Sequence, residues 1–538
     1  MSNFLLNWPG PGWPSEDHLP LSRRSFLQTA GNGAAAALTG LSLRQLLFAK
    51  DNTWAARLAS DPLRPQFHLL PAHNWMNDPN GPIYWNGNYH MFFQYNPGAA
   101  VWGDMHWAHA ISPDMVHWKH MPIALAPTPG GPDQEGCFSG SAVTDGTAAT
   151  VLYTGVKNAP PALATLRDGT HNFRETQCLA SSEDALLKTW NKLPTPVLEP
   201  PDEPKLTGFR DPFLWRSGST WYMGVGSGQQ GGGGRVLLYR STDFRRWEYL
   251  HPLATGKGNG KHTADFVDSG DMWECPDFFQ LGKKHVLLYS TERKVYWQTG
   301  ELDPKELIFH PEKTGFQDFG AFYAPKSQLD AHGNRILWGW IIETRPEAAY
   351  SAAGWAGCMS LPRVLFLNNE NILQFKFLDR LFELHETAFS LVPTPQGERR
   401  QKDIESFTKN FSLPGVSADC ELTIPHKQFE ISFVSGDNLW LAISFDPESV
   451  GNELRIGDKA VGVPAIPGKP HRIRLFLDAS VVECIVDDTV ALTTRNYNIP
   501  DSDLRISLGH SKLDNLVRLD IWKLKPISSD RLTTDFYL

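Results

Sequence analysis

Five β-hairpin segments at a repeating interval constrain the fold of this 538-residue chain more than any other feature. Each segment consists of two short β-type runs joined by a turn, such as Asn86-Gly87 or Asp145-Gly146. Successive segments begin about 50–75 residues apart, a spacing typical of four-stranded propeller blades with some long loops. The pattern predicts a five-bladed β-propeller over residues 63–375. The segments begin at Asp78, Cys137, Arg210, Glu274 and Phe322.

A second repeat, Ser-x-Asp followed by a tryptophan, supports the propeller. It stands before Trp118, Trp190 and Trp247, and each tryptophan leads into a short apolar segment. An aspartate at a corner bonds nearby backbone N–H groups, and a tryptophan packs between neighbouring sheets. We therefore expect this repeat at the turn between the third and fourth strands of a blade.

The pattern changes after about Phe377, where the tryptophan density falls. Residues 472–488 show the simple alternation of half-buried strands. This predicts an antiparallel β-sandwich over residues 400–538. Residues 376–399 are predicted to be a linker that contains a candidate helix. The predicted fold class is therefore all-β, a propeller followed by a sandwich.

The composition excludes several classes of protein. The 50 Lys and Arg against 59 Asp and Glu give a net charge of −9, which argues against a basic nucleic-acid-binding surface. The six cysteines have no Cys-x-x-Cys spacing, so we expect neither a disulfide framework nor a structural zinc site. The 19 Trp, 45 Gly and 40 Pro favour a large β protein with flat apolar surfaces, to which sugars bind well.

Two patterns resemble ligand sites but predict none. His106-x-x-His109 and His117-x-x-His120 have a spacing that points the two rings to opposite faces of a strand, so we expect no metal site. Gly231–Gly234 and Gly256–Lys261 are rich in glycine, but neither precedes a predicted helix, as a phosphate-binding loop does. We therefore expect no cofactor.

The N-terminal region, residues 1–60, is predicted to be an export signal and leader. Residues 22–31 read SRRSFLQTAG and resemble a twin-arginine signal, with Ala49, Ala56 and Ala59 as candidate cleavage positions. The alternative is an alanine-rich surface helix that begins at Ser22. The apolar run is too short to span a bilayer. We expect a periplasmic or secreted protein, with no membrane contact in the mature form. The sequence indicates no oligomeric state.

Three of the five hairpin segments place a carboxylate at their start, namely Asp78, Asp211 and Glu274. The innermost strands of a propeller line its central channel, so these carboxylates are expected to converge. Like charges that converge raise one another's pKa, which is costly without a function. Glycosidic bond cleavage uses one ionised and one protonated carboxyl group. The alternative is structural, because Asp before Pro is a common turn device and Glu274 alone is compatible with an exposed strand edge.

Three sequence blocks contain the carboxylates, namely Trp75-Met-Asn-Asp-Pro-Asn-Gly81, Phe209-Arg-Asp-Pro212 and Trp273-Glu-Cys-Pro-Asp277. They resemble the signatures of glycoside hydrolase family 32, which comprises invertases, inulinases, levanases and related fructosyltransferases. The resemblance extends from about residue 65 to the C-terminus, and the family's fold is a five-bladed propeller followed by a β-sandwich. Supporting segments begin at Gln94, Trp102, Phe138, Phe322 and Gly354.

The resemblance implies a retaining double displacement on a β-fructoside. Asp78 is the implied nucleophile, Glu274 the implied acid/base and Asp211 the implied transition-state stabiliser, with Arg210 orienting the carboxylates. Cys275 either tunes the acid/base or is a plain buried thiol. The residues predicted to bind substrate are Asn77, Asn80, Gln94, Trp102, Phe138, Ser139, Arg210, Tyr323 and Trp355. Trp340 is a further candidate wall of the pocket, with a place in the core as an equal alternative.

The expected function is exo-acting hydrolysis that releases fructose from sucrose, inulin or levan. A fructosyltransferase differs only in whether sugar or water reaches the intermediate, and no residue decides between the two. A non-catalytic sugar-binding propeller is a third hypothesis, which the three carboxylates argue against. A propeller hydrolase acting on arabinan or xylan is the fourth, and such enzymes lack the block that begins at Trp75.

Overall fold

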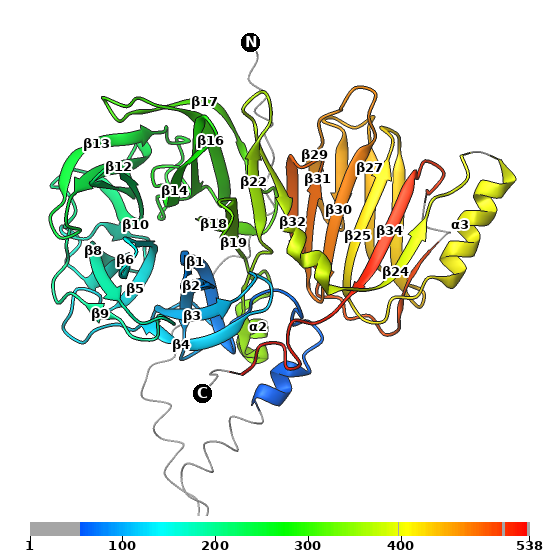
Figure 1. Cartoon of the computed structure of the whole chain (residues 1–538), viewed down its shortest axis with the longest axis horizontal. Helices are drawn as coiled ribbons and strands as arrows, with labels where there is room; N and C mark the ends of the chain where they lie inside the picture. Colours follow the sequence, from blue (N-terminus) through cyan, green and yellow to red (C-terminus); the bar gives the residue numbers. More distant parts are fainter. Residues whose placement is uncertain (1–53, 396, 508–511, 535–538) are drawn as a thin grey trace, which may run out of the picture. The chain divides into compact units, whose positions relative to one another are not determined.

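The computed structural model describes residues 54–395, 397–507 and 512–534, and these residues are mainly β-strands (Figure 1). The candidate export signal at residues 22–31 lies outside the described residues. Among the described residues, no helix has the length and apolar character needed to cross a membrane. The six cysteines are all free and buried.

Five sheets follow one another along residues 74–377, and within each sheet successive strands are mostly antiparallel neighbours. The five predicted hairpins are confirmed as the first two strands of the five sheets. The strands of these sheets are β1 (Asn74–Trp85), β2 (Asn88–Asn96), β3 (His106–Ser112), β4 (Lys119–Leu125), β5 (Gly136–Thr144), β6 (Ala149–Asn158), β7 (Leu166–Arg167), β8 (Asn172–Ser182), β9 (Asn191–Lys192), β10 (Leu206–Ser217), β11 (Thr220–Gln229), β12 (Gly233–Ser241), β13 (Glu248–Thr255), β14 (Glu274–Leu281), β15 (Lys284–Thr291), β16 (Lys294–Leu302), β17 (Phe309–Phe316), β18 (Phe322–Leu329), β19 (Arg335–Ile341), β20 (Trp355–Ala356), β21 (Cys358–Met359), β22 (Arg363–Leu367) and β23 (Leu373–Phe377).

The first strands of the five sheets contact one another in a closed cycle. β1 contacts β5, β5 contacts β10, β10 contacts β14, β14 contacts β18, and β18 contacts β1 again (Figure 1). Each first strand thus lies between two other first strands. Residues at equivalent positions of these strands are therefore brought to one place, although they are far apart in the sequence.

The turn chemistry explains several of these hairpins. Asn86 and Gly87 connect β1 to β2 with φ angles of 46° and 81°, the left-handed conformation that this dipeptide favours. The Ser-x-Asp repeat forms the predicted corners. At the turn between β3 and β4, the Asp114 carboxylate accepts hydrogen bonds from the backbone N–H groups of Val116 and His117. Between β12 and β13, the Asp243 carboxylate accepts hydrogen bonds from the backbone N–H groups of Arg245 and Arg246.

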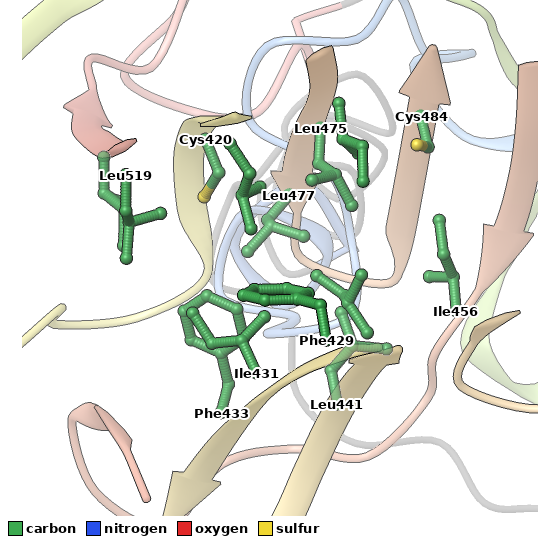
Figure 2. Packing of buried hydrophobic residues seen from close by; sticks show 14 of the residues in the cluster. Cys420, Phe429, Ile431, Phe433, Leu441, Ile456, Leu475, Leu477, Cys484 and Leu519 are labelled. Carbon is green, nitrogen blue, oxygen red and sulfur yellow. The ribbon is translucent and has the colours of Figure 1, made fainter. Parts of the chain in front are cut away.

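Two further sheets pack face to face over residues 385–524 and enclose an apolar core (Figure 2). One sheet has the order β24-β34-β25-β30-β31-β32, and the other has the order β29-β28-β27-β26-β33. Leu475 and Leu477 of β30 face Phe429 and Ile431 of β26 across this core (Figure 2). The strands are β24 (His385–Leu391), β25 (Ser417–Ile424), β26 (Phe429–Ser435), β27 (Asn438–Asp446), β28 (Glu453–Ile456), β29 (Lys459–Gly462), β30 (His471–Asp478), β31 (Val481–Val486), β32 (Val490–Arg495), β33 (Leu504–Ile506) and β34 (Arg518–Leu524).

The structure differs from the prediction in the segment between the two groups of sheets. The candidate helix is a short 3-10 helix, η1 (Asp379–Leu384), and the chain then enters β24, which pairs with β34. The predicted linker 376–399 therefore contains an outer strand of the sandwich. A helix that the sequence analysis did not predict, α3 (Glu398–Asn410), follows and packs Ile404 and Phe407 against the sandwich core.

The structure also differs from the prediction at the end of the predicted leader, residues 1–60. Residues 54–59 form a helical turn, and Leu58 is buried in an apolar cluster with Trp355 and Val481. A short helix, α2 (Glu347–Ala353), lies beside this segment in contact with it. Residues 54–60 thus pack against the rest of the described chain, and the prediction of a leader for the residues before them lies outside the described residues.

Candidate active site

The first strands of the five sheets each carry a β-bulge at an equivalent position. A bulge inserts one extra residue, which bends the strand and re-aims its side chain. Asp211, Cys275 and Ala324 have φ angles of 64°, 47° and 53° at these bulges, which is uncommon for residues other than glycine. The register shifts lie between Met76 and Pro79, Cys137 and Gly140, Arg210 and Phe213, Glu274 and Asp277, and Tyr323 and Lys326.

Asp78 is held in one orientation by donors from three strands. The side-chain amide of Asn77 donates to Oδ1 at 3.0 Å, and the Ser139 hydroxyl donates to Oδ2 at 2.6 Å. The Cys275 thiol also approaches Oδ2, at 3.3 Å. The half-buried Asp78 carboxylate is therefore fixed by β1, β5 and β14 together while part of it still meets solvent.

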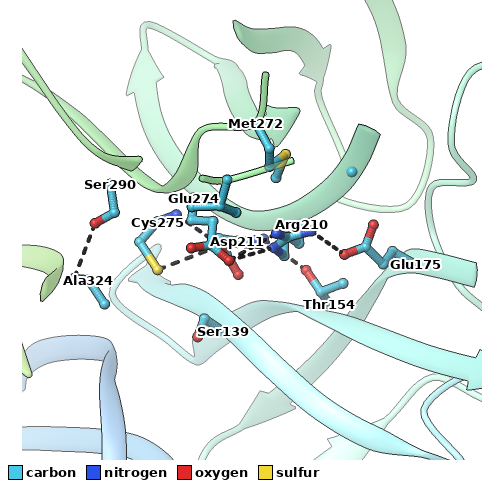
Figure 3. A network of polar contacts seen from close by, with 12 residues as sticks. Ser139, Thr154, Glu175, Arg210, Asp211, Met272, Glu274, Cys275, Ser290 and Ala324 are labelled. Atoms are coloured by element: carbon cyan, nitrogen blue, oxygen red, sulfur yellow. Dashed lines mark hydrogen bonds and ion pairs between the residues drawn. The ribbon is translucent and has the colours of Figure 1, made fainter. Parts of the chain in front are cut away.

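Asp211 is buried, and the Cys275 thiol that approaches Asp78 also lies 3.5 Å from Oδ2 of Asp211 (Figure 3). Its backbone N–H donates to the Thr154 hydroxyl at 2.9 Å, and its Oδ2 accepts from the backbone N–H of Cys275 at 2.8 Å. Burial raises the pKa of Asp211 to about 6, because Arg210 only partly offsets it and the charge of Asp78 adds to it.

Glu274 is held by an arginine on one side and a tyrosine on the other. Arg210 donates from Nε at 3.2 Å and from Nη2 at 2.9 Å to Oε1, and the Tyr323 hydroxyl donates to Oε2 at 2.8 Å. Burial raises the pKa of Glu274 to about 7, although Arg210 and Tyr323 both act to lower it. Glu274 can therefore carry a proton near neutral pH, which a general acid requires.

Glu175 of β8 is a site residue that the sequence analysis missed. Its carboxylate is fully buried, accepts from Arg210 Nη1 at 2.9 Å and accepts from the backbone N–H of Phe209 at 2.7 Å. Arg210 is thereby clamped between Glu175 and Glu274 (Figure 3). Glu175 belongs to no recognisable block, and the only signal is an acidic residue in the middle of a strand.

The polar residues predicted to bind substrate form two groups. Some contact the carboxylates directly, and the others lie behind the residues that do so. Asn77, Ser139 and Tyr323 contact Asp78 or Glu274 directly, as described above. Gln94 is buried, and its amide donates to the backbone carbonyl of Cys137 at 2.9 Å. The fully buried Asn80 lies behind Ser139, with an amide atom 3.2 Å from the Ser139 hydroxyl and the other 3.0 Å from the Gln94 amide.

The predicted aromatic residues are divided in the same way. Trp102 is 41% exposed and meets Phe138 edge to face at 5.9 Å, so both can contribute to an apolar rim. Trp340 is half-buried and packs against Trp75 at 5.8 Å. The prediction that Trp355 lines the pocket is wrong. Its ring is fully buried in the cluster with Leu58, and its indole N–H donates to Asp61 at 2.7 Å.

The histidines of the two rejected metal patterns lie elsewhere. His109 is buried in the first sheet, and its Nε2 lies 2.9 Å from Nδ1 of His90, with the two rings stacked. Burial lowers the pKa of His90 to about 4 and also lowers that of His109. Over the described ranges, no group of three or more His, Cys, Asp or Glu side chains is arranged to hold a metal ion.

The site contains two carboxyl groups of raised pKa, Asp211 and Glu274, and the carboxylate of Asp78, which hydroxyl and amide donors hold. Arg210 bonds Glu274 and lies 4.0 Å from Asp211. Carboxyl groups in unlike environments are the arrangement that glycosidases use to cleave a glycosidic bond. The comparisons with known proteins agree. The model of the glycosyl hydrolases family 32 N-terminal domain matches residues 68–376.

The relatives extend the match over most of the chain. Sucrose-6-phosphate hydrolase of Escherichia coli is 39% identical over 477 residues, which are 83% of this chain and 92% of the relative. Raffinose invertase of Escherichia coli is 37% identical over 505 residues, 87% of this chain and 94% of the relative. The family 32 β-fructofuranosidase of Bombyx mori has a similar structure, with a TM-score of 0.72 at 28% identity, covering 90% of this chain and 99% of that one. The chain belongs to glycosyl hydrolase family 32.

Proposed function

We propose that this protein is a retaining β-fructofuranosidase that removes terminal fructose from β-fructosides by double displacement. The observation that carries the proposal is the pairing of two differently held carboxyl groups. Asp78 is fixed by Asn77 and Ser139, and Glu274 has a pKa raised to about 7. An ionised nucleophile and a protonated acid are what such a reaction needs.

In the first step, Asp78 attacks the anomeric C2 of the fructosyl unit while Glu274 gives its proton to the departing oxygen. A covalent fructosyl–Asp78 ester forms, and the bond between C2 and the leaving oxygen breaks. In the second step, the ionised Glu274 takes a proton from water while the oxygen of that water attacks C2. This releases fructose, frees the Asp78 carboxylate and returns the proton to Glu274.

In this scheme Asp211 accepts hydrogen bonds from fructose hydroxyls. These hydrogen bonds become stronger as positive charge develops on the ring, so they stabilise the transition state. Arg210 orients Glu274 through its two hydrogen bonds. The rim formed by Trp102 and Phe138 gives an apolar face on which a furanose ring can stack. That Asn80 and Gln94 bind the substrate stays a prediction.

The five sheets support the proposed architecture, a five-bladed propeller. Their first strands contact one another in a closed cycle, and each of these strands carries a bulge at an equivalent position. Such a ring brings Asp78, Asp211 and Glu274 from three sheets to one end of a shared channel. The boundaries that we propose for the propeller are about residues 63–375.

The names of the relatives narrow the candidate substrates. The Escherichia coli relatives are a sucrose-6-phosphate hydrolase and a raffinose invertase, and the Bombyx mori enzyme has a mutant structure in complex with sucrose. These substrates have in common a fructofuranosyl unit linked through C2. We therefore propose sucrose and its derivatives as the first substrates to assay, with inulin and levan beside them.

The test is to incubate the purified protein separately with sucrose, sucrose 6-phosphate, raffinose, inulin and levan, and to resolve the products by chromatography over time. The Asp78→Ala variant serves as the control. We expect free fructose from the wild type, as the only early product where a polymer is attacked, and none from the variant.

Other products would change the assignment. Short oligosaccharides appearing first from the polymers would mean endo-cleavage, and kestose-type products from sucrose would mean fructosyl transfer. If no substrate changes and the wild type matches Asp78→Ala, the protein is not a hydrolase of these sugars and a sugar-binding role replaces the proposal.

We also propose that the twin-arginine pattern at residues 22–31 exports the protein. The supporting observation is the sequence alone, Arg23-Arg24 followed by Phe26 and an uncharged run. Replacing both arginines by lysine should hold the protein in the cytoplasm of a bacterial host, measured by fractionation and immunoblotting. An unchanged distribution between the fractions would contradict export by this route.

A further inference from the structure

The segment of residues 54–64, here named the N-terminal strap, is held tightly against the folded protein. Leu58 is 1% exposed and lies in one apolar cluster with Leu70, Ile341 and Trp355. Arg64 is fully buried, and its guanidinium donates to the backbone carbonyl of Ala72 at 3.1 Å. Leu58 and Arg64 therefore anchor the strap in the folded protein, whereas Arg57 and most other residues of the strap lie at the surface.

The strap binds the C-terminal end of α2. Arg57 donates from Nη2 to the backbone carbonyls of Ala352 at 2.8 Å and Ala353 at 3.0 Å. The last carbonyls of a helix have no partner within the helix, and a cation there is favourable. Gly354 follows with a φ of 80°, and the Trp54 ring lies so close that a Cβ at this position would be 2.6 Å from it.

The strap also holds the residue that follows α2. The Trp355 indole N–H donates to Asp61 Oδ2 at 2.7 Å, and the Arg64 guanidinium lies 5.6 Å from the Trp355 ring. Trp355 begins β20, which pairs in parallel with β1 through Asn74↔Trp355 and Trp75↔Ala356. The strap thus fixes the short strand that borders β1 just before Asp78.

A chain of contacts leads from α2 to Asp78. Tyr350 of α2 packs against the Trp75 ring at 5.9 Å. The Trp75 indole N–H donates to Asn77 Oδ1 at 2.7 Å, which orients the Asn77 amide. That amide donates to Asp78 Oδ1 at 3.0 Å. Every link between the strap and the carboxylate is therefore a direct contact.

We propose that the N-terminal strap is a positioning element for Asp78, and that Arg57 is its key positioning residue. Arg57 does not touch the reacting atoms. It holds α2 and β20, and these hold Trp75 and Asn77 in the arrangement that aims the carboxylate. The inference rests on the proposed hydrolysis for its kinetic consequence, but the contacts that it invokes are independent of any substrate.

The test compares Arg57→Ala, Arg57→Lys and the control Arg399→Ala in the full chain, with sucrose at a temperature well below unfolding. Arg399 is exposed on α3 of the sandwich. A misaimed nucleophile lowers kcat more than it raises KM, and we expect a loss in kcat of about 3–10-fold for Arg57→Ala. Arg57→Lys keeps a cation at the helix end and should recover most of the loss, and Arg399→Ala should behave as the wild type.

Hydrogen exchange measured by mass spectrometry gives a second readout that needs no activity. Arg57→Ala should speed amide exchange over residues 74–80 and 347–356, and Arg399→Ala should not. Unchanged kcat together with unchanged exchange over 74–80 would overturn the proposal. Faster exchange in a protein whose wild type cleaves no fructoside would support the strap and reject the hydrolase. If Arg57→Ala does not fold, Arg57→Gln, whose shorter amide cannot bridge both carbonyls, takes its place in both measurements.

Discussion

At the scale of single residues, Glu274 and Asp211 have raised pKa values for the same reason, burial, but they are needed in opposite protonation states. Glu274 must be protonated to act as the acid, so activity should fall as the pH rises through about 7. Asp211 must be ionised to accept hydrogen bonds from the sugar, so activity should fall as the pH drops through about 6. We predict a narrow bell-shaped pH profile of kcat/KM, with its maximum between these two values. Initial rates of sucrose hydrolysis across pH 4–9 test this prediction, because that range extends about two pH units beyond each limb.

The Tyr323→Phe variant tests the assignment of the alkaline limb. The Tyr323 hydroxyl donates to Glu274 and acts to lower the pKa of that carboxyl group. Its removal should therefore move the alkaline limb to higher pH, with the acid limb unchanged. Tyr249→Phe, at an exposed tyrosine, should leave both limbs in place. An alkaline limb that stays fixed or moves to lower pH in Tyr323→Phe would mean that another group titrates there.

The sequence predicted that the three carboxylates converge and that Arg210 orients them, but it did not predict Glu175, which holds Arg210 from the other side. Asp78, Asp211 and Glu274 stand at equivalent places in repeated hairpins, so their convergence follows from the repeat. Glu175 stands in a strand without a motif, and only the folded arrangement reveals its contact with Arg210. Trp355 was wrongly predicted as a pocket wall because a motif gives a residue's neighbourhood but not the side to which its ring turns.

At the scale of elements, the bulge in β5 requires a glycine. A Cβ at Gly140 would lie 2.1 Å from the backbone carbonyl of Leu152 on the paired strand, which no rotamer can relieve. Gly140→Ala should therefore displace the adjacent Ser139, which donates to Asp78. We expect a loss of about 1–3 kcal/mol in the free energy of unfolding, and a kcat/KM at least about 10-fold lower.

Urea denaturation and sucrose kinetics measure the two effects. The matched control is Ser141→Ala in the same strand, which removes a hydroxyl group without adding an atom. Gly140→Ala with wild-type kinetics would show that the bulge does not hold Ser139 in place.

The hairpins were predictable because their turn residues and alternating strands are local signals. β24 and β20 were not, since each depends on a distant partner. β24 is a strand because β34 pairs with it, over a hundred residues later in the chain. β20 has two residues, which are too few to show an alternating hydrophobic pattern. It is a strand because it pairs with the edge of β1.

At the scale of the whole molecule, a buried network of charges joins the segment before β1 to the sandwich. His68 lies 2.7 Å from Asp478 and 3.1 Å from Glu483, and Arg363 lies 2.7 Å from Glu483. Burial acts to lower the pKa of His68, but the hydrogen bonds to both carboxylates outweigh it and raise the pKa. These residues are far apart in the sequence, so no local pattern predicts the network.

The raised pKa of His68 has a consequence for stability. The protonated histidine stabilises the fold fully below its unfolded pKa, and this contribution is lost as the pH rises through the higher folded value. Tm should therefore decrease above about pH 6.5. His68→Gln should lower Tm below that pH and flatten the slope above it, because breaking a buried ion pair costs about 3–5 kcal/mol. Calorimetry from pH 5 to 9 measures the Tm and its slope with pH. This range begins about 1.5 units below the ordinary histidine pKa and extends further above it. A variant with the same slope as the wild type would assign the pH dependence to other groups.

The central claim is that Asp78 forms a covalent intermediate, and the stereochemistry of the product tests it most directly. Two displacements at C2 retain the configuration, whereas direct attack by water inverts it. Sucrose hydrolysis should be followed by NMR with enough enzyme to outrun mutarotation of the product. The account predicts β-fructofuranose as the first-formed product. The α-anomer appearing first would contradict a fructosyl–Asp78 intermediate and with it the proposed mechanism.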